Sequence, residues 1–136
     1  MGYYSDFGLR LEFKENKGER YLETLFNQFL EESDLKEEFE NWGEFDYIFH
    51  NISFSIKNDY DGKDIYLIDV ISYGLKFYGT SDYDGWWIDT FIDWLKVQEI
   101  CEFHYVRIGE YLEDIEEIYS DNIGNMLSVI RQVSFE

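Results

Sequence analysis

One cysteine and two histidines are the side chains of this 136-residue chain that first suggest catalysis or metal binding. Cys101 and His104 are three residues apart, and on a strand this spacing places two side chains on opposite faces, out of reach of each other. His50 has no partner close to it in the sequence, and the set is too small for a zinc site. No glycine-rich phosphate loop and no nucleophile elbow is present. We therefore expect no catalytic residue, no bound metal and no cofactor.

Carboxylates are the abundant reactive groups, because thirty acidic residues face eleven basic ones and give a formal net charge of −19. Three of them, Asp59, Asp61 and Asp64, surround Gly62. Their spacing does not fit a calcium-binding EF-hand loop, which needs glycine at its sixth position and glutamate at its twelfth. The Asp61-Gly62 pair is instead typical of a hairpin turn. Two carboxylates could also serve a hydrolase, although with thirty acids some pair falls at any separation by chance.

The acids are concentrated in two segments, which define the candidate partner-binding residues. The first acidic segment, residues 31–46, has one base, Lys36, and these acids: Glu31, Glu32, Asp34, Glu37, Glu38, Glu40, Glu44 and Asp46. The second acidic segment, residues 110–121, has no base and these acids: Glu110, Glu113, Asp114, Glu116, Glu117 and Asp121. If residues 31–40 are helical, they carry one net negative charge per roughly 3 Å, close to the about 3.4 Å per charge of one B-DNA strand. A solvated helix face is the alternative for either segment alone.

Charge and aromatic content together indicate a protein-binding surface. A strongly acidic surface repels nucleic acid and anionic membranes and attracts basic protein surfaces, so we expect no direct nucleic-acid binding. The chain also has 28 aromatic rings, more than a core of this size readily buries. We expect some of them to be exposed contact anchors, among them Trp42, Tyr83 and Trp86.

Hydrophobic periodicity predicts the elements that must position these residues. Alternating or continuous apolar runs predict strands over residues 7–13, 52–56, 65–71, 101–108 and 126–135. Helical spacing predicts helices over residues 19–32, 33–42, 86–98 and 110–119, the last of which could also be a loop. The two strands of residues 52–71 form a predicted central hairpin. The order predicts an α+β fold, a ferredoxin-like β-α-β-β-α-β antiparallel sheet with helices on one face, plus an extra C-terminal helix and strand.

Length and composition set the wider expectations. Residues 1–136 suit a single domain. No signal peptide and no apolar run long enough to cross a bilayer is present, and the lone cysteine cannot form an internal disulfide. These features predict that the protein is located in a reducing cytoplasm. The chain lacks alanine and proline and is rich in residues with AT-rich codons, which indicates an AT-rich genome such as that of a low-GC bacterium or its phage.

At the level of class, the chain resembles the small, acidic, often DNA-mimicking inhibitors that phages and mobile elements make against host nucleases, such as anti-CRISPR and anti-restriction proteins. The similarity lies in the size, the lone cysteine, the residue usage and the two acidic segments. It implies a non-catalytic protein that occupies the basic channel of a CRISPR effector or restriction-type nuclease, or blocks its movement, in the cytoplasm of a bacterial host cell. An immunity protein that neutralises a basic nuclease toxin is the first alternative, and a small hydrolase or ligand-binding domain is the second.

Overall fold

The computed structural model describes residues 3–78, 80–111 and 113–124. In chain order they form β1 (Tyr4–Phe13), α1 (Tyr21–Glu32), α2 (Lys36–Trp42), the 3-10 helix η1 (Phe45–Tyr47), β2 (Ser53–Asn58), β3 (Asp64–Lys76), α3 (Asp84–Gln98), β4 (Glu102–Gly109) and β5 (Ile115–Tyr119). The strand expected over residues 126–135 lies outside the described residues.

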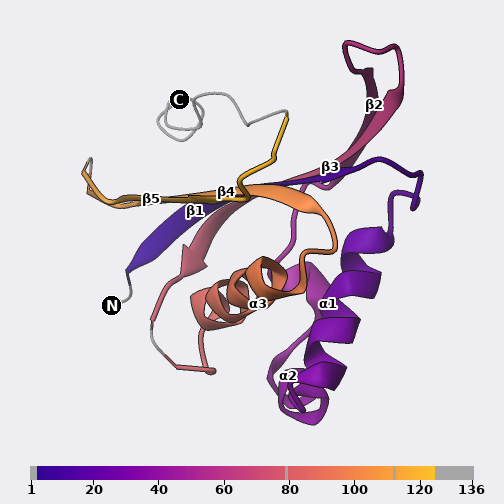
Figure 1. The fold of residues 1–136 in the computed structure, drawn as a ribbon. Helices are drawn as coiled ribbons and strands as arrows, with labels where there is room; N and C mark the ends of the chain where they lie inside the picture. Colours follow the sequence, from indigo (N-terminus) through magenta and orange to yellow (C-terminus); the bar gives the residue numbers. More distant parts are fainter. Residues whose placement is uncertain (1–2, 79, 112, 125–136) are drawn as a thin grey trace.

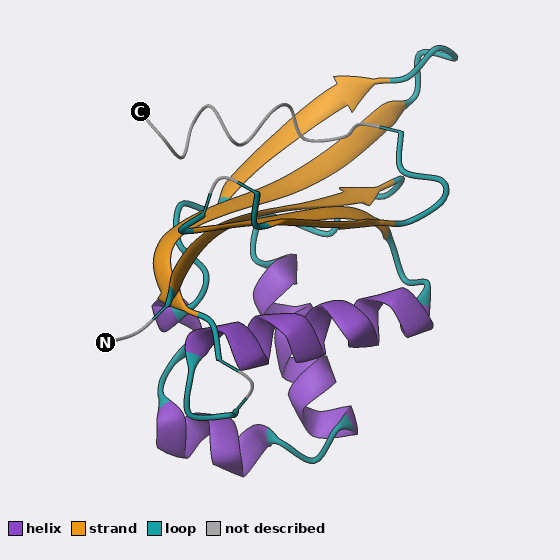
Figure 2. Cartoon of the chain, turned by 90° about the vertical axis from the view of Figure 1, so that its left-hand side faces the viewer, coloured by secondary structure: helices purple, strands orange, loops and turns teal. Residues whose placement is uncertain are grey.

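The described strands make one sheet in the order β2-β3-β1-β4-β5, and each neighbouring pair is antiparallel. The three α-helices all lie on one side of this sheet, so the molecule has a helical layer and a sheet layer (Figures 1 and 2). β1 is in the middle of the sheet and contacts both β3 and β4 along most of its length.

The central position of β1 follows from its alternating sequence. One face carries the apolar side chains, which turn toward the helices and are at most 5% exposed: Phe7, Leu9, Leu11 and Phe13. The opposite face carries Arg10, whose guanidinium group pairs with a carboxylate of β3 at 2.7 Å. A period of two therefore puts the apolar set against the helices and leaves the charged set on the other face.

The helical layer absorbs many of the aromatic rings. Phe26 of α1 is fully buried, and its ring centroid is 5.0–5.9 Å from rings of four elements and of the loop before β2: Phe29, Phe39, Phe45, Phe49 and Phe91. Most of these contacts are edge-to-face, the arrangement that aromatic quadrupoles favour. The expectation that some rings remain exposed is confirmed among the described residues, where six tyrosines are exposed: Tyr4, Tyr47, Tyr60, Tyr73, Tyr111 and Tyr119.

The predicted α+β class is confirmed, but the specific ferredoxin-like topology is not matched. The described sheet has five strands, and a further helix, α2, follows α1 before the chain enters β2. The helix expected over residues 110–119 is wrong, because residues 115–119 pair with β4 as the edge strand β5. The turn that leads into it is closed by a hydrogen bond from the Gly109 amide to the Asp114 carbonyl at 2.8 Å.

The hairpin of β2 and β3 forms as predicted, although it is not the centre of the sheet. Gly62 has a φ of 76°, and the Asp59 carboxylate accepts hydrogen bonds from the amides of Asp61 and Lys63 at 2.9 Å each. The Asp59 carboxylate is thus engaged by the backbone of its own turn. β2 is an edge strand with almost every residue exposed, because the hairpin extends beyond the helices (Figure 1).

Candidate functional site

The first acidic segment is shaped by the way α1 ends. Asp34 adopts a left-handed conformation with φ 56°, the amide of Leu35 donates to the carbonyl of Leu30 at 2.8 Å, and the amide of Asp34 donates to the carbonyl of Glu31 at 3.3 Å. This is the Schellman arrangement, in which aspartate is tolerated at a position that glycine usually occupies. Asp34 therefore terminates α1 and does not cap α2, and the chain reverses at once into α2.

Phe39 fixes which face of α2 points outward. Its side chain is 5% exposed, and its ring lies 5.0 Å from Phe26 and 4.9 Å from Trp87. Because Phe39 is the buried residue of this seven-residue helix and packs against α1 and α3, most of the other residues of α2 face solvent. The sequence of α2, Lys-Glu-Glu-Phe-Glu-Asn-Trp, supplies acids at those positions.

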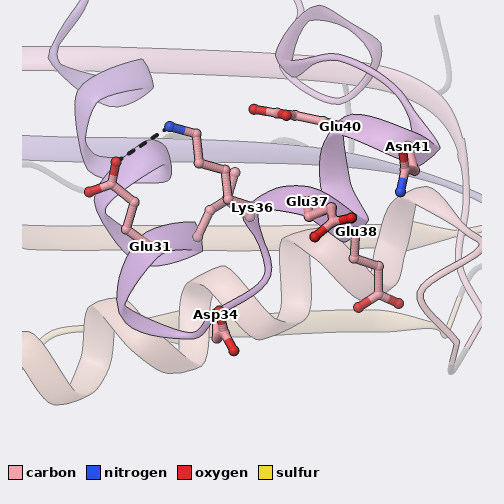
Figure 3. A pocket seen from close by; sticks show the side chains of 8 residues that line it. Glu31, Asp34, Lys36, Glu37, Glu38, Glu40 and Asn41 are labelled. Atoms are coloured by element: carbon pink, nitrogen blue, oxygen red, sulfur yellow. Dashed lines mark ion pairs between the residues drawn. The ribbon is translucent and has the colours of Figure 1, made fainter.

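Every acid of the first acidic segment is exposed in the structure, as expected: Glu31, Glu32, Asp34, Glu37, Glu38, Glu40, Glu44 and Asp46. The carboxylates of α2 project outward beside the pair that Lys36 makes with Glu31 at 3.5 Å (Figure 3). No other ion pair involves residues 31–46 within the described chain. We call these eight acids the acidic surface. Five of them border an open hollow of ≈ 660 Å³ between the end of α1 and α2: Glu31, Asp34, Glu37, Glu38 and Glu40.

A loop distant in sequence extends the acidic surface. The Ser81 hydroxyl donates to Glu38 Oε1 at 2.8 Å, and the indole Nε1 of Trp42 donates to the carbonyl oxygen of Asp82 at 3.0 Å. These contacts hold the loop of residues 80–83 against α2, with the Asp82 side chain exposed. Asp82 is an acidic neighbour that the sequence did not single out, because forty residues separate it from Trp42.

The three aromatic residues expected as exposed anchors are only partly exposed, which corrects that expectation. Trp42 packs on Trp87 with ring centroids 5.8 Å apart, and Trp86 packs on the same ring at 4.9 Å. Tyr83 packs on Tyr78 with centroids 4.1 Å apart. These rings are half-buried because they pack on Trp87 or Tyr78, and sequence periodicity does not show such contacts.

Tyr47 is the exposed ring beside the acidic surface that sequence reasoning missed. It is 56% exposed and lies edge-on to Trp42, with centroids 6.2 Å apart. A β-carbon on Gly43 would collide with the Tyr47 ring, so the glycine that ends α2 also makes room for it. The sequence signal for this exposed ring was Gly43, which lies two residues before the Phe-Asp-Tyr segment of residues 45–47.

The second acidic segment does not form one ridge, because strand geometry separates its members. Glu116 lies across from Arg107 in the register of β4 and β5, with Oε1 3.8 Å from the guanidinium, whereas Glu117 pairs with His104 at 2.7 Å on the other face. Asp114 is held by Arg107 at 2.9 Å.

Further contacts engage this segment, so a larger share of its carboxylates is held by the protein's own groups than in the first acidic segment. The Arg107 guanidinium and then the Tyr3 hydroxyl hold the pKa of Asp114 below its usual range. Glu110 accepts a hydrogen bond from the amide of Tyr4 at 2.9 Å. Glu113 and Asp121 are exposed members for which no side-chain contact is found within the described residues.

The residues that first suggested catalysis are Cys101, His104 and His50, and burial or hydrogen bonding engages each of them. Burial, and then the neighbouring Glu102 carboxylate, raise the pKa of the Cys101 thiol to about 12. Such a thiol is protonated near neutral pH and is a poor nucleophile. His104 is 2% exposed and bonds Glu117, and the backbone amide of His50 donates to the Ser72 hydroxyl at 2.9 Å.

Among residues 3–78, 80–111 and 113–124, no group of three or more His, Cys, Asp or Glu side chains has the geometry to hold a metal ion. None of the helices described is long and apolar enough to cross a membrane.

Comparison with known proteins gives no relative from which a role could be transferred. No family model, no characterised protein and no solved structure matches the chain. The acidic surface must therefore be interpreted from its own chemistry.

Proposed function

We propose that the protein inhibits a nucleic-acid-binding enzyme, a CRISPR effector or a restriction-type nuclease, by placing the acidic surface in the basic channel that normally holds phosphates. One observation carries this proposal: all eight carboxylates of residues 31–46 are exposed, with one lysine among them. A folded protein gains no stability from such crowding, since like charges repel. A basic partner would turn the same charges into charge-assisted hydrogen bonds.

Binding would combine steered association with a small aromatic contact. A net charge of −19 raises the rate at which the protein associates with basic surfaces. Tyr47, beside the carboxylates, offers an aromatic side chain for the drier part of an interface. In this mechanism the protein acts by occupancy, without catalysis, in the cytoplasm of a bacterial host cell. The same surface would serve an immunity protein against a basic nuclease toxin, so the two proposals differ in partner and not in physics.

Purified nucleases provide the test. The protein would be titrated into DNA-cleavage reactions of restriction enzymes, CRISPR effectors and basic nuclease toxins, while fluorescence anisotropy measures its own binding to labelled single- and double-stranded DNA. The proposal expects inhibition of a defence nuclease with no binding to DNA alone, since phosphate contacts need clustered bases. Inhibition of a toxin only would establish the immunity alternative. Micromolar binding to DNA at physiological salt, or no inhibition in any reaction, would refute the proposal.

A further inference from the structure

A second hollow, of ≈ 290 Å³, lies on residues outside the acidic surface. Four charged side chains from different parts of the fold line it: Asp89 of α3, Arg107 of β4, Asp114 of the turn before β5, and Glu116 of β5. We call this hollow the cleft. Three carboxylates and one guanidinium group converge in it, so the cleft carries a net negative charge when all of them are ionised.

The guanidinium group that lines the cleft, that of Arg107, is already hydrogen-bonded within the protein. Arg107 donates two hydrogen bonds to Asp114, at 2.9 and 3.1 Å, and the Tyr3 hydroxyl donates a further one to the same carboxylate. Glu116 is reached only at 3.8 Å. Asp89 forms no ion pair with any residue that the structure describes. Two carboxylates, Asp89 and Glu116, thus remain weakly compensated.

A buried hydroxyl group points to a missing ligand. Tyr105 of β4 is fully buried, and its hydroxyl oxygen has no hydrogen-bond partner among the described residues. Its charged neighbours are Asp89, Glu116 and Arg107, all of which line the cleft. Buried hydroxyl groups almost always have a partner, because an unpaired one loses its hydrogen bonds to water without replacement. An N–H donor that enters the cleft between Asp89 and Glu116 would give this hydroxyl group the partner it lacks.

The protonation of Asp89 indicates the charge of that ligand. Although the residue is exposed along one side, partial burial of its carboxyl group, and then the charge of Glu116, raise its pKa to about 6. The charge of Arg107 and the nearby Tyr105 hydroxyl group act in the opposite direction, and Asp93 on the same helix adds to the rise. A carboxyl group in this setting favours a positive ligand, since a nearby cation restores its ionised form.

The neutral part of the lining also suits a cation. Tyr3, Phe77 and Tyr78 supply aromatic walls, and the Arg107 guanidinium already lies over the Phe77 ring, 5.5 Å from its centroid. Aromatic faces attract ammonium and guanidinium groups. The volume is at the small end of ligand pockets, which are about 300–1,000 Å³, so it fits a side-chain head group better than a nucleotide.

We propose that the cleft binds one guanidinium or ammonium group, contributed by an arginine or lysine side chain of a protein partner. Only the choice of a protein as the source rests on the proposed function. The loop of residues 80–83 connects the two sites: Tyr83 packs on Tyr78 at the cleft, and Ser81 bonds Glu38 on the acidic surface. One basic protein surface can therefore reach both.

The test uses the isolated protein and small cations. N-acetyl-arginine methylamide and N-acetyl-lysine methylamide would be titrated while NMR follows the backbone amides and the Asp89 side-chain carboxyl carbon. We expect shifts centred on Asp89, Arg107 and Glu116, and a fall of about one unit or more in the pKa of Asp89 at saturation. By linkage, affinity should rise about tenfold between about pH 4.5 and about pH 7.5. Asp89→Asn should remove this rise, whereas the exposed control Glu19→Gln should keep it.

Three results would overturn the proposal. The first is an unchanged pKa of Asp89 at saturation, and the second is an Asp89→Asn protein that binds with the wild-type pH dependence. The third is binding of the diffusible amine spermidine but of neither amino-acid derivative, which would make a free polyamine the ligand. Since no nuclease is present, a failure here leaves the proposed inhibition intact, and a protein that inhibits no nuclease can still bind these cations.

Discussion

At the scale of single residues, the stability of the protein depends on a few side chains between sheet and helices. Leu11 is fully buried on the helix-facing side of β1. We expect Leu11→Asp to cost at least about 3 kcal/mol, because Leu→Ala in cores already costs about 2–5 and the carboxyl group adds desolvation. Thermal or urea unfolding measures this loss. Tyr60→Asp, at a fully exposed hairpin position, is the control and should unfold like the wild type; equal stability of both variants would contradict the position of β1.

Asp89 gives a residue-scale prediction with a sign that depends on pH. Its pKa of about 6 lies above the ordinary value of 3.8, so between these values the folded state holds a proton that the unfolded state releases. Stability is therefore lost as pH rises through this range. Asp89→Asn should melt at a higher temperature than wild type at about pH 7.5 and at nearly the same temperature at about pH 4. A difference that is the same at both pH values would contradict the raised pKa.

At the scale of elements, sequence periodicity predicted the helices and strands that have one buried face. It missed the strand whose formation depends on pairing with its neighbour. α1, α3 and β1 carry apolar residues at a clear period, and each forms close to its expected range. Residues 110–119 carry apolar residues at helical spacing without a strand's alternation, and pairing with β4 nevertheless makes residues 115–119 the strand β5. The exposure of the acids of α2 was predictable, because Phe39 is the inward-facing residue of that helix. The cleft was not, since its four charged residues meet only when α3, β4 and β5 assemble.

Amide hydrogen exchange tests the element that the sequence misassigned. As an edge strand, β5 bonds β4 on one side only, so amides should be protected at every second residue of Ile115–Tyr119. A helix would protect consecutive amides after its first turn. Exchange of the wild-type protein followed by NMR distinguishes the two patterns, with β4, which is paired on both sides, as the internal reference. Protection of consecutive amides would contradict the strand.

At the scale of the whole molecule, the net charge of −19 opposes folding and favours basic partners. Moderate salt, about 0.15 M against about 0.01 M, shortens the screening length from about 30 to about 8 Å. It should raise the melting temperature of the free protein and slow its association with a basic partner. Calorimetry measures the first effect and binding kinetics the second. An affinity insensitive to salt would contradict an electrostatic mechanism.

Charge reversal on the acidic surface is the most direct test of the proposed inhibition. Glu37, Glu38 and Glu40 would be changed together to lysine, and the matched control would change three exposed acids elsewhere: Glu19, Glu113 and Asp121. Both variants shift the net charge equally and should stay folded. In the cleavage assay of the inhibited nuclease, the first variant should inhibit at least about 100-fold more weakly, because each lost charge-assisted hydrogen bond costs about 1–3 kcal/mol. The control should inhibit nearly like the wild type; folded variants that inhibit equally well would contradict a role for the acidic surface.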